Sequence, residues 1–327
     1  MKSRILRRIS FLFISSILLF TGCNSNNTDE ATPAETSTEP SQSENVDNEK
    51  LTVYTSFFPV HDLTEKIVGD KWDLRTIIRN GEEPHGFELK TKDMAEITDA
   101  DLIIYNGAGM ESFIDDLKAT VNDDDKFLDL SQGLVLLETE GSDLVEENSN
   151  SHDNVNPHTW LSIRNAIEEL DTIYQMAAAI DPENEEFFKA NLEKSQAEFE
   201  ELDKEFEETL SNVDDEDKYF VVSHAAFNYL ANDYGLHQVA VTGLSPEDEP
   251  SAKQLKKIAD FVEEKGLKTI LFEGKATPKV AETLANQTGV KTDTIYTMES
   301  VSEEEAKEGY TGLMKKNLEV LMRVFNE

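Results

Sequence analysis

A single helical pattern between Pro182 and Asn212 constrains the fold of this chain more than any other feature of its sequence. Apolar residues recur there at helical spacing, and no proline or glycine interrupts the pattern after its first position. The apolar stripe consists of Phe188, Leu192, Phe199, Leu202, Phe206 and Leu210. At ~1.5 Å per residue the helix should be about 45 Å long, which is more than one lobe requires. We therefore expect a stiff strut that joins two lobes.

The segments on both sides of this helix alternate between strand-like and helix-like patterns. Before it, residues 51–57 and 101–105 are predicted strands, and residues 60–68 are a predicted helix. After it, the predicted strands are 219–222, 238–241, 269–272 and 292–296, and the predicted helices are 225–234, 251–265, 278–288 and 307–325. Repeated β-α units imply parallel sheets, whose ligand groups collect beyond the carboxyl ends of the strands. The sequence thus predicts an α/β protein with two lobes of parallel-sheet β-α units.

The N-terminus has the pattern of a lipoprotein signal peptide. Four basic residues precede an apolar run at residues 9–20, which is too short to anchor the chain as a spanning helix. The run leads into Thr21, Gly22 and Cys23, the only cysteine of the chain. This ending resembles the bacterial lipoprotein box, in which the thiol is diacylated, and two acyl chains suffice for stable membrane attachment. An ordinary signal peptide with an incidental cysteine is the alternative.

The whole chain divides into five predicted parts. After a signal peptide at 1–22, residues 23–50 are rich in Asn, Ser, Thr, Glu and Pro and are a predicted disordered tether. An N-terminal lobe at 51–181, the linking helix at 182–212 and a C-terminal lobe at 213–327 complete the chain. With these boundaries, we expect the flexible tether to hold the folded body away from the membrane.

The chain is strongly acidic. Its formal charge is −37, and loss of the four basic residues of the signal peptide changes this to −41. Such a charge argues against nucleic acid as a partner. It suits a saline or alkaline habitat, or the attraction of cations, and says nothing about the fold.

Three of the six histidines lie in short settings of the kind that builds metal sites. His85 and His158 each follow a proline, and His224 follows the apolar run at 219–222. Neutral imidazole is the commonest nitrogen ligand of metals in proteins, and a structural site usually needs four donors. We expect the fold to bring these three rings together.

The chain resembles the metal-binding lipoproteins of bacterial ABC importers (cluster A-I), in their zinc-binding, ZnuA/AdcA-like branch. The resemblance covers nearly all of residues 51–327. The motifs that carry it are SFFPV at 56–60, PHGFEL at 84–89, NPHTW at 156–160, SHAAFNYL at 223–230, GLSP at 243–246 and EPS at 249–251. It implies a metal site in the cleft between two lobes and delivery of a divalent metal to a membrane permease and its ATPase. The protein would be a monomer, lipid-anchored on the extracytoplasmic side of the cell membrane.

The resemblance also implies a ligand set. His85, His158 and His224 match the three histidine ligands of the family, and Glu299, at the end of the last predicted strand, matches the fourth. Glu273, which also follows a strand, and a water molecule remain alternatives for the fourth position. Three imidazoles and one carboxylate suit tetrahedral zinc, whereas manganese prefers more oxygen donors. In manganese-type relatives a glutamate replaces the third histidine, so His224 favours Zn²⁺ over manganese or another divalent metal.

Other residues and functions fit the pattern less well. The acidic segment 138–156, with His152, occupies the place of the family's metal-gathering loop, but an ordinary solvated loop explains it better. We expect His61 to lie at a helix start or to support the site, and His237 to be structural.

A zinc hydrolase needs an open coordination position for water, and the chain lacks the usual hydrolase motifs. A surface adhesin would leave the three histidines unexplained, so we expect no enzymatic activity and favour transport.

Overall fold

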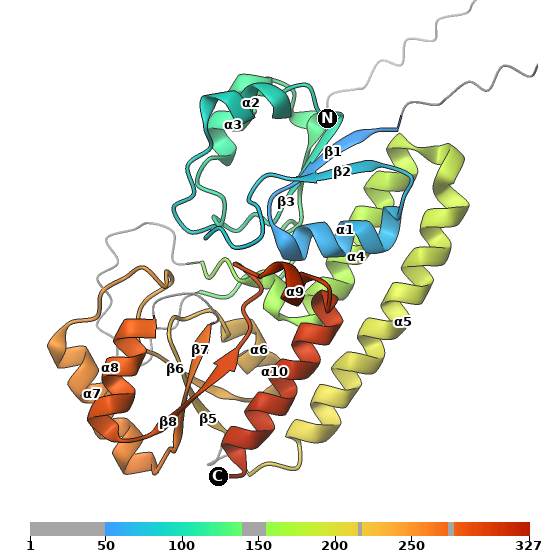
Figure 1. Cartoon of the computed structure of the whole chain (residues 1–327). Coiled ribbons are helices and arrows are strands. Elements are labelled where there is room, and N and C mark those ends of the chain that lie inside the picture. The colour runs from blue at the N-terminus through green and yellow to red at the C-terminus, as the bar shows by residue number, and fades with distance from the viewer. Residues whose placement is uncertain (1–49, 139–154, 215–217, 274–277) are drawn as a thin grey trace, which may run out of the picture. The chain divides into compact units, whose positions relative to one another are not determined.

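The computed structural model describes residues 50–138, 155–214, 218–273 and 278–327, all of which belong to the unit Asn48–Glu327. The predicted signal peptide, Cys23, nearly all of the tether, and His152 lie outside the described residues. Figure 1 shows two lobes, each with one sheet and helices packed around it. Within the described residues, no helix combines the length and apolar character needed to cross a membrane. The five predicted domain boundaries remain a prediction.

The N-terminal lobe is built on a parallel sheet with the order β2-β1-β3-β4. Its strands are β1 (Thr52–Thr55), β2 (Asp73–Thr76), β3 (Leu102–Tyr105) and β4 (Phe127–Asp129). The two central strands, β1 and β3, are the two that the sequence predicted, because a strand covered on both faces is a continuous apolar run. The edge strands β2 and β4 were not predicted. β2 is a polar DLRT segment and β4 has only three residues, so neither carries a clear strand pattern.

The helices of this lobe surround the sheet. They are α1 (Phe58–Val68), α2 (Thr91–Ile97), α3 (Ile114–Val121) and α4 (Ile163–Ile180), with 3-10 turns η1 (Asp124–Lys126) and η2 (Thr159–Leu161). The turn η2 directly follows His158 and separates it from α4. α4 begins at Ser162, whose hydroxyl accepts the N–H of Asn165, a normal N-cap.

The C-terminal lobe repeats the arrangement with the parallel order β6-β5-β7-β8. Its strands are β5 (Tyr219–Val222), β6 (His237–Ala240), β7 (Thr269–Glu273) and β8 (Lys291–Ile295). Its helices are α6 (Asn228–Tyr234), α7 (Ala252–Lys265), α8 (Pro278–Thr288), α9 (Glu303–Ala306) and α10 (Gly309–Phe325). The four predicted strands and the four predicted helices are all present, with ends that shift by no more than three residues, and α9 is an additional turn.

The predicted long helix is confirmed. The 3-10 turn η3 (Pro182–Asn184) leads into α5 (Glu185–Leu210), a helix of 26 residues and about 39 Å. Every member of the predicted apolar stripe is buried. α5 packs against α1 and α4 of the first lobe and against α6 and α10 of the second, and Figure 1 shows it alongside α4 and α10.

One hydrophobic core continues through both lobes. It includes Val53 and Leu63 of the first lobe, Phe199 of α5, and Phe220 and Leu313 of the second. Where the lobes meet, the ring of Phe199 stacks on that of Tyr310 with centroids 5.0 Å apart. A smaller core lies between the second sheet and helix α7. Because the lobes share buried apolar surface, their relative position is fixed by packing as well as by the connecting helix.

Candidate metal centre

His85 lies in the loop between β2 and α2. Pro84 begins a tight turn there, closed by a hydrogen bond from the Phe87 amide to the Pro84 carbonyl (3.1 Å). The Glu83 carboxylate accepts the backbone N–H of His85 (3.1 Å) and so holds the turn from which the ring projects. The His85 side chain keeps 12% of its surface exposed, while His158, His224 and Glu299 are buried. His85 therefore forms the solvent-facing side of the site.

His158 is oriented by Asn156. The backbone N–H and the ring Nδ1 of His158 both donate to Oδ1 of Asn156, over 3.0 and 2.7 Å. The amide group has a fixed orientation, because its Nδ2 donates to the carbonyl of Ala225 in the other lobe (2.8 Å). The proton of a neutral His158 ring therefore sits on Nδ1, and the lone pair lies on Nε2.

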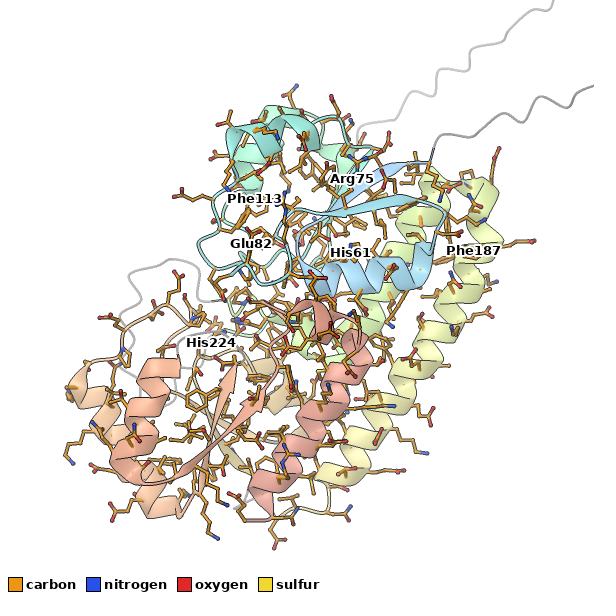
Figure 2. All side chains as sticks on the ribbon, in the orientation of Figure 1. His61, Arg75, Glu82, Phe113, Phe187 and His224 are labelled. Atoms are coloured by element: carbon orange, nitrogen blue, oxygen red, sulfur yellow. The ribbon has the colours of Figure 1, made fainter. Side chains whose placement is uncertain are left out.

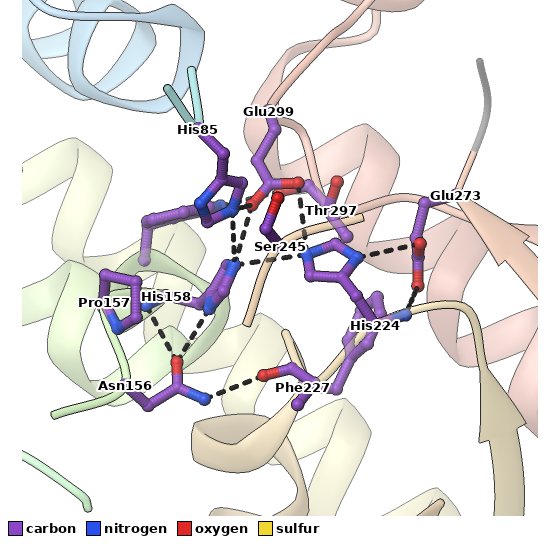
Figure 3. A network of polar contacts seen from close by, with 12 residues as sticks. His85, Asn156, Pro157, His158, His224, Phe227, Ser245, Glu273, Thr297 and Glu299 are labelled. Atoms are coloured by element: carbon purple, nitrogen blue, oxygen red, sulfur yellow. Dashed lines mark hydrogen bonds and ion pairs between the residues drawn. The ribbon is translucent and has the colours of Figure 1, made fainter. Parts of the chain in front are cut away.

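His224 follows β5 and is held in the same way by Glu273. Its Nδ1 donates to Oε2 of Glu273 (2.9 Å), and its backbone N–H donates to Oε1 (3.2 Å). Figure 3 shows Glu273 on the side of the His224 ring that faces away from His158. The sequence left Glu273 open as an alternative fourth ligand, but this geometry fits support of His224 rather than a place in the cluster.

Glu299 reaches the cluster from a loop. The sequence interpretation placed Glu299 at the end of the last strand, but β8 ends at Ile295. Glu299 directly follows Met298, whose backbone φ is +65°. From there its Oε1 lies 2.8 Å from Nε2 of His158 and 3.1 Å from Nε2 of His85, and its Oε2 lies 3.5 Å from Nε2 of His224.

The four side chains converge on one point. One potential ligand atom from each of His85, His158, His224 and Glu299 lies within 4.8 Å of all the others (Figure 3). Nε2 of His158 lies 3.2 Å from Nε2 of His85 and 3.2 Å from Nε2 of His224. Two nitrogens bound to one tetrahedral zinc at ~2.0–2.1 Å would lie about 3.3 Å apart. The cluster thus has the spacing of a four-coordinate metal site with donors from both lobes.

The charges of these groups depend on their neighbours. Burial lowers the pKa of His158 to about 4, although Glu299 opposes the shift. Burial would lower the pKa of His224 too, but the carboxylates of Glu273 and Glu299 outweigh it and raise this pKa well above its ordinary value. For Glu299, burial favours a higher pKa, but His224 and His158 outweigh it and hold the pKa well below the usual range. At neutral pH the site therefore holds an ionised Glu299, a protonated His224 and a neutral His158.

One contact in this arrangement calls for a cation. The lone pair on Nε2 of the neutral His158 faces the ionised Oε1 of Glu299 across 2.8 Å, with no proton between the two acceptors. Two buried acceptors at this distance repel each other, and a metal ion bound to both turns the repulsion into attraction.

Beside the site, burial and the charge of Glu299 raise the pKa of Glu83 to about 7, a shift that the hydrogen bond from His85 opposes.

The two other described histidines, His61 and His237, lie elsewhere. His61 is on α1, away from His224 (Figure 2), and its Nδ1 lies 3.1 Å from the hydroxyls of Thr55 and Thr76. His61 therefore falls within the first turn of a helix, as the sequence indicated, and outside the cluster. His237 begins β6 and its ring stacks on Tyr219 with centroids 4.5 Å apart, which agrees with a structural role.

Sequence reasoning did not assign the groups that support the cluster. Asn156 was noted only as part of the NPHTW motif, and no pattern in the sequence shows that it bridges His158 and Ala225. Two buried carboxyl groups near the His158 segment were also missed. Burial raises the pKa of Glu111 to about 7 and that of Glu169 to about 8, with hydrogen bonds from neighbouring groups opposing both shifts. The helical pattern around Glu169 could have suggested that this residue is buried, whereas no pattern in the sequence indicates that Glu111 is.

The sequence and the fold match those of known proteins over most of the chain. The model of the family described as "Zinc-uptake complex component A periplasmic" matches residues 53–324. The chain is 38% identical over 282 residues to the high-affinity zinc uptake system protein ZnuA of Bacillus subtilis, which covers 84% of this chain and 87% of that protein.

Two further relatives come from Streptococcus pneumoniae. The zinc-binding lipoprotein AdcA is 38% identical over 288 residues, or 85% of this chain, but the chain spans only 56% of its length. The crystal structure of the Zn(II)-bound ZnuA-like domain of AdcA matches with a TM-score of 0.72 and 36% identity, and the match covers 85% of this chain and 100% of that domain. The likeness to AdcA is therefore a likeness to its ZnuA-like domain.

Proposed function

The chain belongs to the family of zinc-uptake complex component A proteins, and from this membership we propose that it captures Zn²⁺ on the outer side of the cell membrane and delivers it to an ABC permease. The observation that carries the proposal is the buried pair formed by Nε2 of His158 and the ionised Oε1 of Glu299, 2.8 Å apart. Above the lowered pKa of His158, where Nε2 carries no proton, a bound cation makes this contact favourable. His85 and His224 add two more nitrogen donors at matching distances.

The donor set favours zinc among the divalent metals. Three imidazole nitrogens and one carboxylate oxygen are typical of tetrahedral zinc, whereas manganese prefers oxygen ligands and a higher coordination number. We propose His85, His158, His224 and Glu299 as the four ligands. Glu273 then holds His224, because a carboxylate bonded to Nδ1 of a ligating histidine fixes its orientation and raises its basicity.

We propose a binding role rather than catalysis. Four protein donors at tetrahedral spacing leave no coordination position for the activated water that a zinc hydrolase requires. The metal is then the cargo of the protein and must be released again. Release would fall to the permease, acting with its ATPase.

The location follows from the N-terminus. We propose that Cys23 is diacylated and holds a monomer on the extracytoplasmic face of the membrane, with residues 23–50 as a tether. The lipobox pattern and the lipoprotein AdcA support this. In this arrangement residues 51–181, the helix at 182–212 and residues 213–327 form the metal-binding body.

Metal binding can be tested on the acylated full-length protein in detergent, by native mass spectrometry with zinc and manganese in competition. We expect one zinc ion per chain and little manganese. A variant with His85→Ala, His158→Ala and His224→Ala should bind no zinc at concentrations that saturate the wild type. His237→Ala, which changes a histidine outside the cluster, is the matched control and should bind like the wild type.

Two results would contradict the proposal. Zinc binding by the triple variant at wild-type affinity would show that the cluster is not the site, and preference for manganese would show that zinc is not the cargo. The anchor has a separate test, since Cys23→Ala should abolish labelling by a lipid precursor. Persistent labelling of that variant would refute the proposed acylation site.

A further inference from the structure

The loop that carries Glu299 is held in an unfavourable backbone conformation. Met298 has φ of +65°, one of three positive φ values among the described non-glycine residues, and its side chain is buried. A long side chain disfavours this conformation, so the surrounding structure must impose it. Glu299 is the next residue, and a change at Met298 would redirect its carboxylate.

Two groups fix the loop before Glu299. The side chain of Asn317, on α10, accepts the N–H of Tyr296 and donates to its carbonyl, both over 2.8 Å. The carbonyl of Thr297 accepts a hydrogen bond from the indole Nε1 of Trp160 (2.7 Å). Asn317 thus belongs to the same lobe as the loop, whereas Trp160 reaches it from the other lobe.

Trp160 is itself tightly placed. Its side chain is fully buried, edge-on to Phe57 with centroids 4.9 Å apart and 5.3 Å from the ring of His158. Its carbonyl accepts the hydroxyl of Tyr310 on α10 (2.6 Å). Two buried hydrogen bonds between the lobes therefore meet at this one residue, which follows His158 by two positions.

We propose that Trp160 is a positioning residue of the metal site: its indole N–H fixes the Thr297 carbonyl and thereby aims the Glu299 carboxylate at the histidine nitrogens. This inference rests on the proposed zinc function. A single short segment of the first lobe then supplies both the proposed ligand His158 and the indole N–H that orients the proposed ligand Glu299 of the second lobe. Without the N–H, the Thr297 carbonyl is buried with no donor, and the loop can relax toward the preferred backbone of Met298.

The chain offers a matched control in its second tryptophan. Trp72 is also buried, and its indole N–H also donates one hydrogen bond, to Oδ2 of Asp181 (3.0 Å). It packs on Phe188 of α5, and within the described residues no hydrogen bond or ring contact joins it to any of the four proposed ligands. Trp160→Phe and Trp72→Phe therefore remove the same chemical group from two buried sites, of which only one orients a ligand.

The experiment measures zinc affinity of the full-length protein by chelator competition, and coordination by the visible spectrum of the Co²⁺ form. Removing a group that orients a metal ligand typically lowers affinity 10- to 100-fold. We expect a loss of about that size for Trp160→Phe, and a shift of the cobalt spectrum toward that of Glu299→Gln. Trp72→Phe should keep the wild-type affinity and spectrum.

A double-mutant cycle separates positioning from a general loss of stability. If Trp160 acts through Glu299, Trp160→Phe should cost little further affinity in a Glu299→Gln background. Additive losses, an equal loss in Trp72→Phe, or an unchanged affinity of Trp160→Phe would each overturn the inference. None of these results would bear on the zinc function, which has its own tests in the triple histidine variant and in the competition between zinc and manganese.

A second variant serves if Trp160→Phe does not fold. In a Trp72→Phe background Trp160 is the only tryptophan, because the chain has two. Replacing tryptophan globally with benzothienylalanine then substitutes sulfur for the N–H at position 160 alone and preserves the shape of the ring. The same loss of affinity supports the inference, and wild-type affinity refutes it.

Discussion

Glu273→Gln should weaken zinc binding by an amount that depends on pH. Glu273 accepts two hydrogen bonds from His224, one from Nδ1 and one from the backbone N–H, and it lies outside the ligand cluster. A glutamine can still accept the Nδ1 hydrogen bond through its single oxygen, but it loses the negative charge and the second strong acceptor. Changes at such supporting groups lower metal affinity by roughly 10- to 100-fold, or about 1.4–2.7 kcal/mol.

A second effect of the substitution acts in the opposite direction. Glu273 is the largest of the attractive contributions that raise the pKa of His224 above its ordinary value against the effect of burial. Zinc must displace the proton on His224, so below that pKa the apparent affinity of the wild type falls about tenfold per pH unit. Without the carboxylate the pKa of His224 is lower and less proton must be displaced. The loss of affinity should therefore be full in alkaline solution and smaller near pH 6.

Isothermal titration calorimetry in buffers of different ionisation enthalpy measures both quantities. The wild type should release about one proton per zinc at neutral pH, since His224 is protonated and His158 is neutral there. Glu273→Gln should release less. Glu169→Gln changes another buried glutamate, with no contact to a ligand side chain, and should release as much as the wild type. A loss of affinity that is the same at every pH, with unchanged proton release, would refute the reasoning.

Two further predictions concern stability without zinc. The Thr159 hydroxyl is within donor distance of both Oδ1 of Asn106 (2.9 Å) and Oε1 of Glu169 (3.2 Å), and its hydrogen bond to Glu169 opposes the effect of burial on the pKa of that carboxyl group. The folded pKa of Glu169, about 8, exceeds the unfolded value of 4.5, so between these pH values the unfolded state loses the proton that the folded state keeps. The free energy of unfolding should therefore fall as pH rises through this window, by up to ~1.4 kcal/mol per pH unit. Urea unfolding of Glu169→Gln should show a weaker dependence of stability on pH there, and an unchanged dependence would contradict this. Gly107→Ala should lower stability by roughly 2 kcal/mol or more, because the added Cβ would lie 1.9 Å from Oδ1 of Asp129. Gly109 has a similar positive φ but no atom near the position of an added Cβ, so Gly109→Ala should lower stability less. Equal losses of stability in thermal unfolding would disprove the clash.

The parts of the fold that sequence predicted are those with buried, repeating patterns. The strand at Leu102–Tyr105 and the stripe on α5 are apolar because both are enclosed by other elements. The edge strand at Asp73–Thr76 has one side open to solvent, so three of its four residues are polar and the side-chain pattern does not reveal its hydrogen bonds to β1. The helix α2 buries only Ile97, which leaves no stripe to detect.

The ligands were predictable to a different degree. The three histidines stood out because histidine is scarce and each lies in a recognisable motif. The choice between Glu273 and Glu299 needed the structure, because both were interpreted as lying at strand ends. Two observations favour Glu299 as the proposed ligand: the backbone turn at Met298, which brings Glu299 to the histidines, and the two hydrogen bonds that hold Glu273 behind His224.

Protonation is the property of this site that sequence could least reveal. His158 and His224 are both fully buried, so burial alone lowers the pKa of each. Their ring Nδ1 atoms meet different partners, a neutral amide from Asn156 and a carboxylate from Glu273, and their pKa values consequently move in opposite directions. The proton that competes with zinc therefore resides on the histidine of the second lobe. Since Asn156 and Glu273 both lie outside the cluster, the difference between the two histidines comes from residues beyond the four proposed ligands.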